Sequence, residues 1–351
     1  MSQTSIFQNF YPMTRGLKSF PQAGRYLASR KQYEEYNVEW EEFYKANKSI
    51  VPLLFGPVTE LRGMMLKAKL RGQGKAKPVD KSLTAKDHPI PSSDGNNAVQ
   101  ITVRSYIPHS TATDLPGMLY FHGGGWALGD LDGEDRFCRH LCSNLQLVVV
   151  SVDYRLAPEN PYPAQLNDAW AALDWTMKNH VSLQLDVDKL LIGGTSAGAN
   201  LAAVVCHSSK QRGVNIQGQL LRIPVLCPSE PHHSELGLRS MVDLNDSAIL
   251  TPESTRQFLQ WYRPIDTSHV TVSPLLATSF DSLPPTFLQI CGRDPLRDEG
   301  LAYADALESS GVPVRVKIYS GLPHAFWIFP DISATAAAED DLLEGVKWLI
   351  N

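Results

Sequence analysis

The sequence predicts an α/β fold built on a mostly parallel β-sheet, and three observations support this. Short apolar strand patterns alternate with longer helical patterns from about residue 98 onward. Residues 145–152 form a continuous apolar run, which is typical of a parallel strand covered on both faces. Several of the strand patterns run directly into glycine-containing loops. With 351 residues, 43% of them hydrophobic, the chain can bury one large core.

The N-terminal part differs from the rest of the chain. Residues 1–75 have helical character, and residues 51–70 form an apolar, partly amphipathic stretch. A membrane-surface helix is one interpretation of that stretch. A packing helix is favoured, because basic residues are few and apolar positions recur at helical spacing. Residues 71–97 are rich in Gly, Lys, Pro, Ser and Asp, and they predict a linker.

The remaining elements follow the linker in order. We expect strands at residues 99–107, 117–121, 145–152, 189–193, 219–226, 286–291 and 314–319. We expect helices at residues 164–180, 200–208, 298–310 and 334–349. In the first of these helices Leu166, Trp170 and Leu173 fall on one apolar stripe. Residues 229–270 are polar and partly helical, so they predict an insertion.

Charge and cysteine content narrow the class of protein. The formal net charge is −5, and no basic face suggests binding to nucleic acid. The five cysteines are odd in number and show no paired framework, which favours reduced thiols. Cys138 and Cys142 are four residues apart, but no nearby partner set completes a metal site, so core packing is favoured. Without a signal peptide or a long apolar run, we expect a cytoplasmic protein with no stable membrane insertion.

The strongest chemical signal is the GTSAG run of residues 194–198. It follows a predicted strand and precedes a predicted helix, which is the context of a nucleophile elbow. There Ser196 would sit on a sharp turn, between glycines that avoid clashes with the neighbouring strand and helix. The N-terminus of the helix would direct its dipole and free amides at developing negative charge. An ordinary strand-to-helix turn is the alternative interpretation.

A second signal is the HGGGW run of residues 122–126, which also follows an apolar strand. Consecutive glycines let the backbone approach a bound oxygen with exposed N–H groups. Together with the amide after the nucleophile, such donors can form an oxyanion hole. A flexible glycine loop is the plain alternative. A phosphate-binding loop is disfavoured, because neither a GK[ST] sequence nor a GxGxxG run opening a helix is present.

Candidates for the acid and the base follow two later strands. Asp294 comes just after the predicted strand at 286–291, and His324 comes after the one at 314–319. The order Ser, Asp, His along the chain is the order expected for a nucleophile elbow on this type of sheet. Asp298 is the rival acid. Asp294 is favoured, because it lies nearer the strand end and the following proline fixes the turn.

Taken together, these motifs resemble the hormone-sensitive-lipase-like family of α/β-hydrolases. The resemblance spans about residues 117–330 and rests on the stretches HGGGW at 122–126, SVDYRLAPE at 151–159, GTSAG at 194–198, SPLL at 273–276, DPLRDE at 294–299 and PHAF at 323–326. It departs from the family pattern at the elbow, which usually carries Asp where this chain has Thr195 and Gly where it has Ala199. The loop at 129–135 also departs somewhat.

The resemblance implies an eight-stranded, mostly parallel sheet with a helical cap. The cap would combine an N-terminal cap segment and linker (1–97) with an insertion at 229–270 of the catalytic domain (98–351). It implies a catalytic triad of Ser196, Asp294 and His324. It further implies an oxyanion hole formed by the amides of Gly124, Gly125 and Ala197.

The expected function is therefore that of a serine carboxylesterase, which cleaves small to medium acyl esters or lactones through an acyl-enzyme. No metal or organic cofactor is expected. The partner is a small-molecule ester, and a homodimer is compatible with the sequence. Apolar side chains at cap positions could line a substrate pocket or form a packed cap core equally well: Phe55, Met64, Met65, Leu66, Phe258, Trp261 and Tyr262.

Two other functions are compatible with this scaffold. One is a non-hydrolytic enzyme that performs an elimination or cyclisation with the same oxyanion hole. The other is a small-molecule receptor, which is disfavoured because receptors of this kind typically lose a triad member and here all three are present. The sequence does not identify the natural substrate, the preference for acyl or alcohol group, or the oligomeric state.

Overall fold

The computed structural model describes residues 24–73, 82–94 and 97–351. They form an eight-stranded sheet in the order β1-β2-β4-β3-β5-β6-β7-β8. β2 runs antiparallel to both β1 and β4, and all other neighbours are parallel. The strands are β1 Leu83–Asp94, β2 Asn97–Pro108, β3 Leu115–Phe121, β4 Val148–Asp153, β5 Leu185–Thr195, β6 Gly218–Arg222, β7 Thr286–Arg293 and β8 Val314–Pro323.

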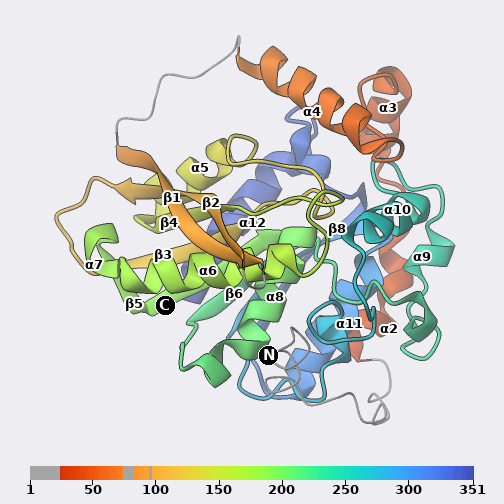
Figure 1. The fold of residues 1–351 in the computed structure, drawn as a ribbon. Helices are drawn as coiled ribbons and strands as arrows, with labels where there is room; N and C mark the ends of the chain where they lie inside the picture. The colour runs from red at the N-terminus through yellow and green to blue at the C-terminus, as the bar shows by residue number, and fades with distance from the viewer. Residues whose placement is uncertain (1–23, 74–81, 95–96) are drawn as a thin grey trace.

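Helices cover both faces of this sheet, as the alternation of strands and helices predicts. The main ones are α5 Asp135–Leu145, α6 Ala164–Lys178, α8 Ala197–Ser209, α11 Arg297–Ser309 and α12 Ser333–Ile350. In Figure 1, α6 and α8 lie in front of the sheet and α12 lies behind it. The predicted mostly parallel eight-stranded α/β-hydrolase sheet is confirmed.

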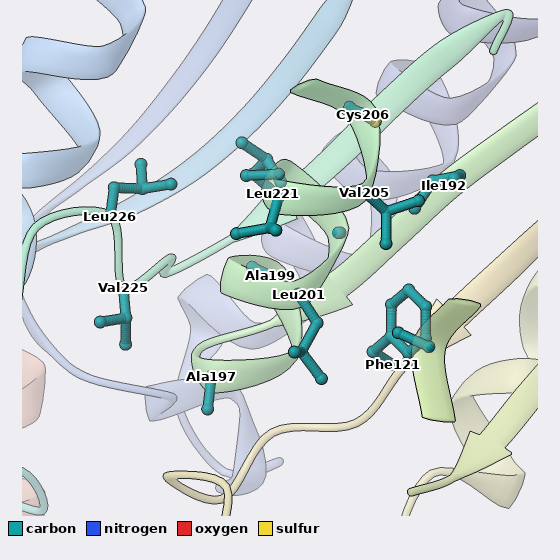
Figure 2. Packing of buried hydrophobic residues seen from close by; sticks show 14 of the residues in the cluster. Phe121, Ile192, Ala197, Ala199, Leu201, Val205, Cys206, Leu221, Val225 and Leu226 are labelled. Carbon is teal, nitrogen blue, oxygen red and sulfur yellow. The ribbon is translucent and has the colours of Figure 1, made fainter. Parts of the chain in front are cut away.

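The central strands divide the core because successive side chains point to opposite faces. On β3, Met118 and Tyr120 face the layer that contains α5 and α12, whereas Leu119 and Phe121 face the layer that contains α6 and α8. Figure 2 shows Leu201 and Val205 of α8 packed toward Phe121. This packing fixes the first turn of α8, which Ser196 directly precedes.

Two parts of the sheet differ from the sequence-based prediction. The region predicted as a linker, residues 71–97, contains β1, so the sheet begins before the predicted domain boundary at 98. β1 is an edge strand, and Pro89 and Pro91 are tolerated there because one side of the strand has no ladder partner. β6 is shorter than predicted, because the chain leaves the sheet at Ile223, whose φ is 41°. Residues 74–81 and 95–96 lie outside the described residues.

The N-terminal segment and the insertion at 229–270 contribute further helices: α2 Arg25–Ala28, α3 Val38–Asn47, α4 Val58–Gln73, α9 Ser240–Asp243 and α10 Pro252–Tyr262. Figure 1 shows α3, α4, α9 and α10 together at one side of the molecule. Helical character is therefore present in the described part of residues 1–75, and the predictions for residues 1–23 lie outside the described residues. The division into domains stays a prediction.

The amphipathic stretch at 51–70 provides most of α4, and α4 packs on the rest of the molecule through few residues. Leu61 is buried, and the Arg62 guanidinium donates to the Ala127 and Ala157 carbonyls and to Glu159. On the other face of α4, the side chains of Leu66 and Leu70 are more than half exposed. Within residues 24–73, 82–94 and 97–351 we find no helix that combines the length and the apolarity of a membrane span.

Trp40 anchors the N-terminal segment. The side-chain oxygen of Asn37 accepts a hydrogen bond from the backbone N–H of Trp40 and so caps the N-terminus of α3. The indole is 1% exposed and packs against Phe43, Tyr44 and Phe329, with ring centroids 5.7–5.9 Å away. This aromatic cluster joins α3 to the loop that follows His324.

Replacing Trp40 with Ala should therefore destabilise the protein by about 3–5 kcal/mol, because it empties a buried aromatic site. Thermal unfolding followed by circular dichroism measures the effect as a lower midpoint. Val38→Ala is the matched control, since Val38 lies on the same helix and is 69% exposed. Equal midpoints for the two variants would show that the segment is not anchored through Trp40.

Candidate active site

Ser196 occupies a strained turn between β5 and α8. Its φ of 55° and ψ of −116° lie in a region that non-glycine residues rarely adopt. The Ser196 N–H donates to the Arg222 carbonyl at 2.8 Å, and its own carbonyl accepts from the Asn200 N–H at 3.1 Å. The strain is thus held by hydrogen bonds from the neighbouring strand and the first turn of α8.

The two glycines beside the serine are required by close backbone contacts. A Cβ atom on Gly194 would lie 2.3 Å from the Gly198 carbonyl carbon. A Cβ atom on Gly198 would lie 2.1 Å from the Phe121 carbonyl oxygen on β3. A larger residue at either position would push α8 away from the sheet. The local geometry is that expected for a nucleophile elbow rather than for an ordinary turn.

An imidazole and a carboxylate meet beside this turn. Asp294 follows β7 and His324 follows β8, and both side chains are almost fully buried. The His324 Nδ1 lies 2.7 Å from the Asp294 Oδ2. Because a carboxylate can only accept, Nδ1 carries the proton and Nε2 is left as a free base in neutral His324. The Leu296 N–H donates to the other Asp294 oxygen at 2.9 Å and orients the carboxylate.

The rival acid, Asp298, is engaged elsewhere. One of its oxygens accepts from the Arg297 guanidinium at 2.8 Å, and the other accepts from the backbone N–H groups of Arg239 and Ser240. Its contacts therefore join α11 to the start of α9 in the cap region, and His324 is paired with Asp294. Both carboxylates belong to the DPLRDE stretch, and the structure gives them different partners.

The glycine loop of residues 122–126 lies next to the elbow. Gly124 and Gly125 have φ values of 118° and 59°, which favour glycine. A Cβ atom on Gly124 would lie 2.3 Å from the Leu128 carbonyl oxygen. Two N–H groups, those of Ala127 and Leu128, donate to the Gly124 carbonyl and close the turn. The loop is therefore a defined turn rather than a flexible glycine linker.

His122 supports this loop from inside the core. Its ring stacks on Tyr154 with centroids 4.1 Å apart, and its Nδ1 lies 2.8 Å from the Gly123 carbonyl oxygen. Burial lowers the pKa of His122 to about 4. The imidazole is therefore neutral near pH 7, and Nδ1 can donate to the carbonyl without placing a positive charge beside the site.

Ser196 and His324 line one small cavity, together with Gly124 and Gly125. Its volume is about 40 Å³, which is room for about three water-sized groups. Apart from these residues the lining is mostly apolar and comes from several elements: Leu54, Trp126, Val225, Pro228, Leu250, Thr255, Phe258 and Leu296. Ala197 is the first residue of α8, so its N–H has no acceptor within the helix.

The cap residues that the sequence singled out have different positions. Phe258 of α10 lines the cavity and lies close to Gly125. A Cβ atom added to Gly125 would lie 2.2 Å from the Phe258 ring. Tyr262 is buried and stacks on Trp126 with centroids 4.2 Å apart. In contrast, Phe55 and Leu66 are about half exposed. The cap thus contains a pocket wall, a packed core and a solvent-facing surface.

The sequence did not single out several lining residues. Leu54 and Leu250 are adjacent in space, because the Leu54 N–H donates to the Ile249 carbonyl at 2.8 Å. They are almost 200 positions apart, and neither belongs to a motif. The only signal was their place in the two segments predicted to form the cap. Their role as pocket walls follows from tertiary packing.

Comparison with known proteins agrees with this architecture. A family model described as an alpha/beta hydrolase fold matches residues 118–328. Carboxylesterase NlhH of Mycobacterium tuberculosis is 37% identical over 243 residues, which are 68% of this chain and 74% of the relative. Versiconal hemiacetal acetate esterase of Dothistroma septosporum is 29% identical and covers 91% of this chain and 96% of the relative.

Among solved structures, vibralactone cyclase superposes with a TM-score of 0.82 at 29% identity. The match covers 91% of this chain and 96% of the cyclase. Together with the family model and the identity to NlhH, this settles the membership that the motifs suggested. The chain belongs to the hormone-sensitive-lipase-like family of α/β-hydrolases and is a carboxylic-ester hydrolase.

Proposed function

We propose that this chain hydrolyses esters with a small acyl group, such as acetate esters of larger alcohols, with Ser196 as the nucleophile. The observation that carries this proposal is the shared cavity. Ser196, His324 and two glycines with positive φ line one small, mostly apolar space. The His324–Asp294 hydrogen bond leaves the base nitrogen available for the serine proton.

In the proposed reaction, His324 Nε2 accepts the Ser196 proton as Oγ attacks the ester carbonyl. Asp294 keeps the proton on Nδ1 and stabilises the imidazolium. The amides of Gly124, Gly125 and Ala197 receive the oxyanion, each contributing roughly 3–4 kcal/mol to the transition state. The imidazolium then protonates the leaving alcohol, and a water molecule activated by His324 releases the acid from Ser196.

The size of the cavity supports the preference for small acyl groups. A volume of about 40 Å³ has room for a group of acetyl size beside Ser196. Phe258 closes the side next to Gly125. One relative is named for an acetate ester substrate, versiconal hemiacetal acetate, which is in line with this size. Lactones are chemically equivalent substrates.

Cyclisation is the second candidate reaction, because a neighbouring structure is named a cyclase. It would use the same oxyanion-binding amides and an acyl-enzyme from which an internal hydroxyl, instead of water, displaces the serine. Chromatography of the products distinguishes the two reactions, since hydrolysis releases a free acid and cyclisation releases a lactone.

We also propose a cytoplasmic location and a small-molecule ester as the partner. All five cysteines are free and buried, with no disulfide that would require an oxidising compartment. Expression of a fluorescent fusion, followed by fractionation, tests the location. Recovery in a secreted fraction would contradict it.

The wild-type protein should cleave 4-nitrophenyl acetate and butyrate and lose activity steeply toward laurate. Ser196→Ala should reduce the rate to the uncatalysed background, because it removes the attacking oxygen. Release of 4-nitrophenolate measures both. Folded wild-type protein that is inert across the whole series would contradict the proposed ester hydrolysis of small acyl groups.

Asp294→Asn should lower kcat by roughly 10⁴-fold, because an amide in place of the carboxylate favours the wrong imidazole tautomer. Asp298→Asn is the matched control from the same stretch. It should change kcat less than tenfold while lowering the thermal midpoint, since Asp298 accepts hydrogen bonds from Arg297 and the start of α9. Equal losses of kcat in the two variants would argue against Asp294 as the acid.

Phe258→Ala should move the optimum of the acyl series to longer chains, because it removes the ring that closes the cavity beside Gly125. The ratio of kcat/KM for octanoate to that for acetate should rise at least tenfold. Leu259→Ala on the same helix is the control, since Leu259 does not line the cavity. An unchanged ratio in Phe258→Ala would place the acyl group elsewhere.

A further inference from the structure

A hydrogen bond between Tyr120 and Thr195 joins the two strands that lead into the active site. Tyr120 lies near the end of β3, just before the glycine loop of residues 122–126, and Thr195 ends β5, directly before Ser196. The two hydroxyl oxygens are 2.7 Å apart, and the hydrogen bond between them is buried. Because β3 and β5 are parallel neighbours, this bond links the glycine loop and the elbow at the point where both leave the sheet.

Both partners of this bond are enclosed and uncharged. The Tyr120 ring is fully buried and packs on the Phe137 ring, with centroids 4.6 Å apart, and Thr195 is buried as well. Burial raises the pKa of Tyr120 well above that of a tyrosine in water, so the phenol is protonated near neutral pH. Thr195 is also the position where the elbow departs from the family pattern, which usually carries Asp. The elbow of this chain is therefore joined to β3 by two neutral hydroxyls.

Thr195 in turn lies directly against the glycine loop. The three atoms nearest to a Cβ atom added to Gly123 would all belong to Thr195: its carbonyl oxygen at 3.2 Å, its Cγ2 at 3.3 Å and its own Cβ at 3.6 Å. Gly123 immediately precedes Gly124 and Gly125, whose amides are the proposed oxyanion donors. The side chain that Tyr120 holds is therefore the one on which the loop of the donors packs.

We propose that Tyr120 is a positioning residue that, through Thr195, sets the distance between the oxyanion-binding amides and Ser196. This inference rests on the proposed ester hydrolysis. The Ser196 N–H donates to the Arg222 carbonyl and fixes the elbow relative to β6, and the Tyr120–Thr195 bond fixes it relative to β3. A displacement of catalytic groups by about 1 Å can cost on the order of 10²-fold in rate. Tyr120 does not line the cavity, so it acts on the transition state only through its neighbours.

Removing this bond should affect turnover rather than substrate binding. Tyr120→Phe and Thr195→Val should each lower kcat for 4-nitrophenyl acetate about 10-fold, with KM within about twofold of wild type, because the donors move relative to Ser196. The Tyr120 hydroxyl also lies 3.5 Å from Glu134 Oε2, so Thr195→Val is the variant that removes the Thr195 contact alone. The double variant should lose at most about twofold more than either single variant, since all three lack the same bond. Thr195→Ser keeps the hydroxyl and should stay within about threefold of wild type.

Tyr106→Phe is the matched control. Tyr106 is also fully buried, and its hydroxyl donates to Asp135 at 3.0 Å, but it lies on β2, which β4 separates from β3. This variant should lower the thermal midpoint as Tyr120→Phe does and leave kcat unchanged. Titration with a fluorophosphonate counts the reactive serines, so kcat is expressed per folded site. Equal losses of kcat in Tyr106→Phe and Tyr120→Phe would reduce the effect to general destabilisation and overturn the positioning role.

Two other results would also overturn the positioning role: losses of kcat that multiply in the double variant, or a kcat in Thr195→Val within about twofold of wild type. The rate of fluorophosphonate labelling separates this inference from the proposed function, because the phosphonyl oxygen would occupy the same amides. If wild-type protein is labelled but cleaves no ester, only the proposed function fails. Labelling about 10-fold slower in Thr195→Val would then still support the positioning role, and equal labelling would overturn it. Wild-type protein that is not labelled at Ser196 would overturn both.

Discussion

The close approach of α8 to β3 governs the rest of this site. Only because Gly198 has no side chain can the first turn of α8 contact the carbonyls of Phe121 and His122. That contact places the free amide of Ala197 beside the glycine loop and leaves Ser196 on a turn with positive φ. The tightly packed layer between α8 and the sheet supplies the burial energy that maintains this strain. A serine held in this strained conformation depends on the whole core beneath it.

The proposed acid and base depend on a different part of the chain. The N-terminal segment lies against the ends of β7 and β8, which precede these two residues, since a Cβ atom on Gly292 would lie 2.3 Å from the Tyr33 carbonyl oxygen and one on Gly321 would lie 2.2 Å from the Asn37 nitrogen. Arg297, which is fully buried, joins Glu34 to the Gly292 carbonyl. The segment that covers the pocket therefore also supports the His324–Asp294 pair.

Much of the site could be predicted from local sequence, because its chemistry depends on positions at strand ends. The GTSAG run sets the geometry of Ser196 within five residues, and Asp294 and His324 each follow a recognisable buried strand. Strand β1 could not be predicted in this way, since Pro89, Pro91 and its charged residues hide a pattern that an edge strand does not need. Helix α5 was also missed, although its buried residues Cys138, Leu141 and Cys142 recur at helical spacing.

The contact that closes the cavity could not be predicted from local sequence for a further reason. Phe258 meets Gly125 only after the sheet has brought distant segments together. The residue type does not suggest such a role by itself, because a phenylalanine on a helix is usually part of the core. What identifies Phe258 is the shape of the space around the glycine loop.

The path of residues 33–37 past the ends of β7 and β8 also bears on how such an enzyme can diversify. If the N-terminal segment only covered the pocket, it could be exchanged between relatives as a separate module. Here the backbone of Tyr33 and Asn37 fills the space that side chains would occupy at Gly292 and Gly321. An exchanged N-terminal segment would have to reproduce this backbone path before it could contribute a new pocket wall. Selection for new substrates should therefore act more freely on α10 and its neighbours than on the start of the cap.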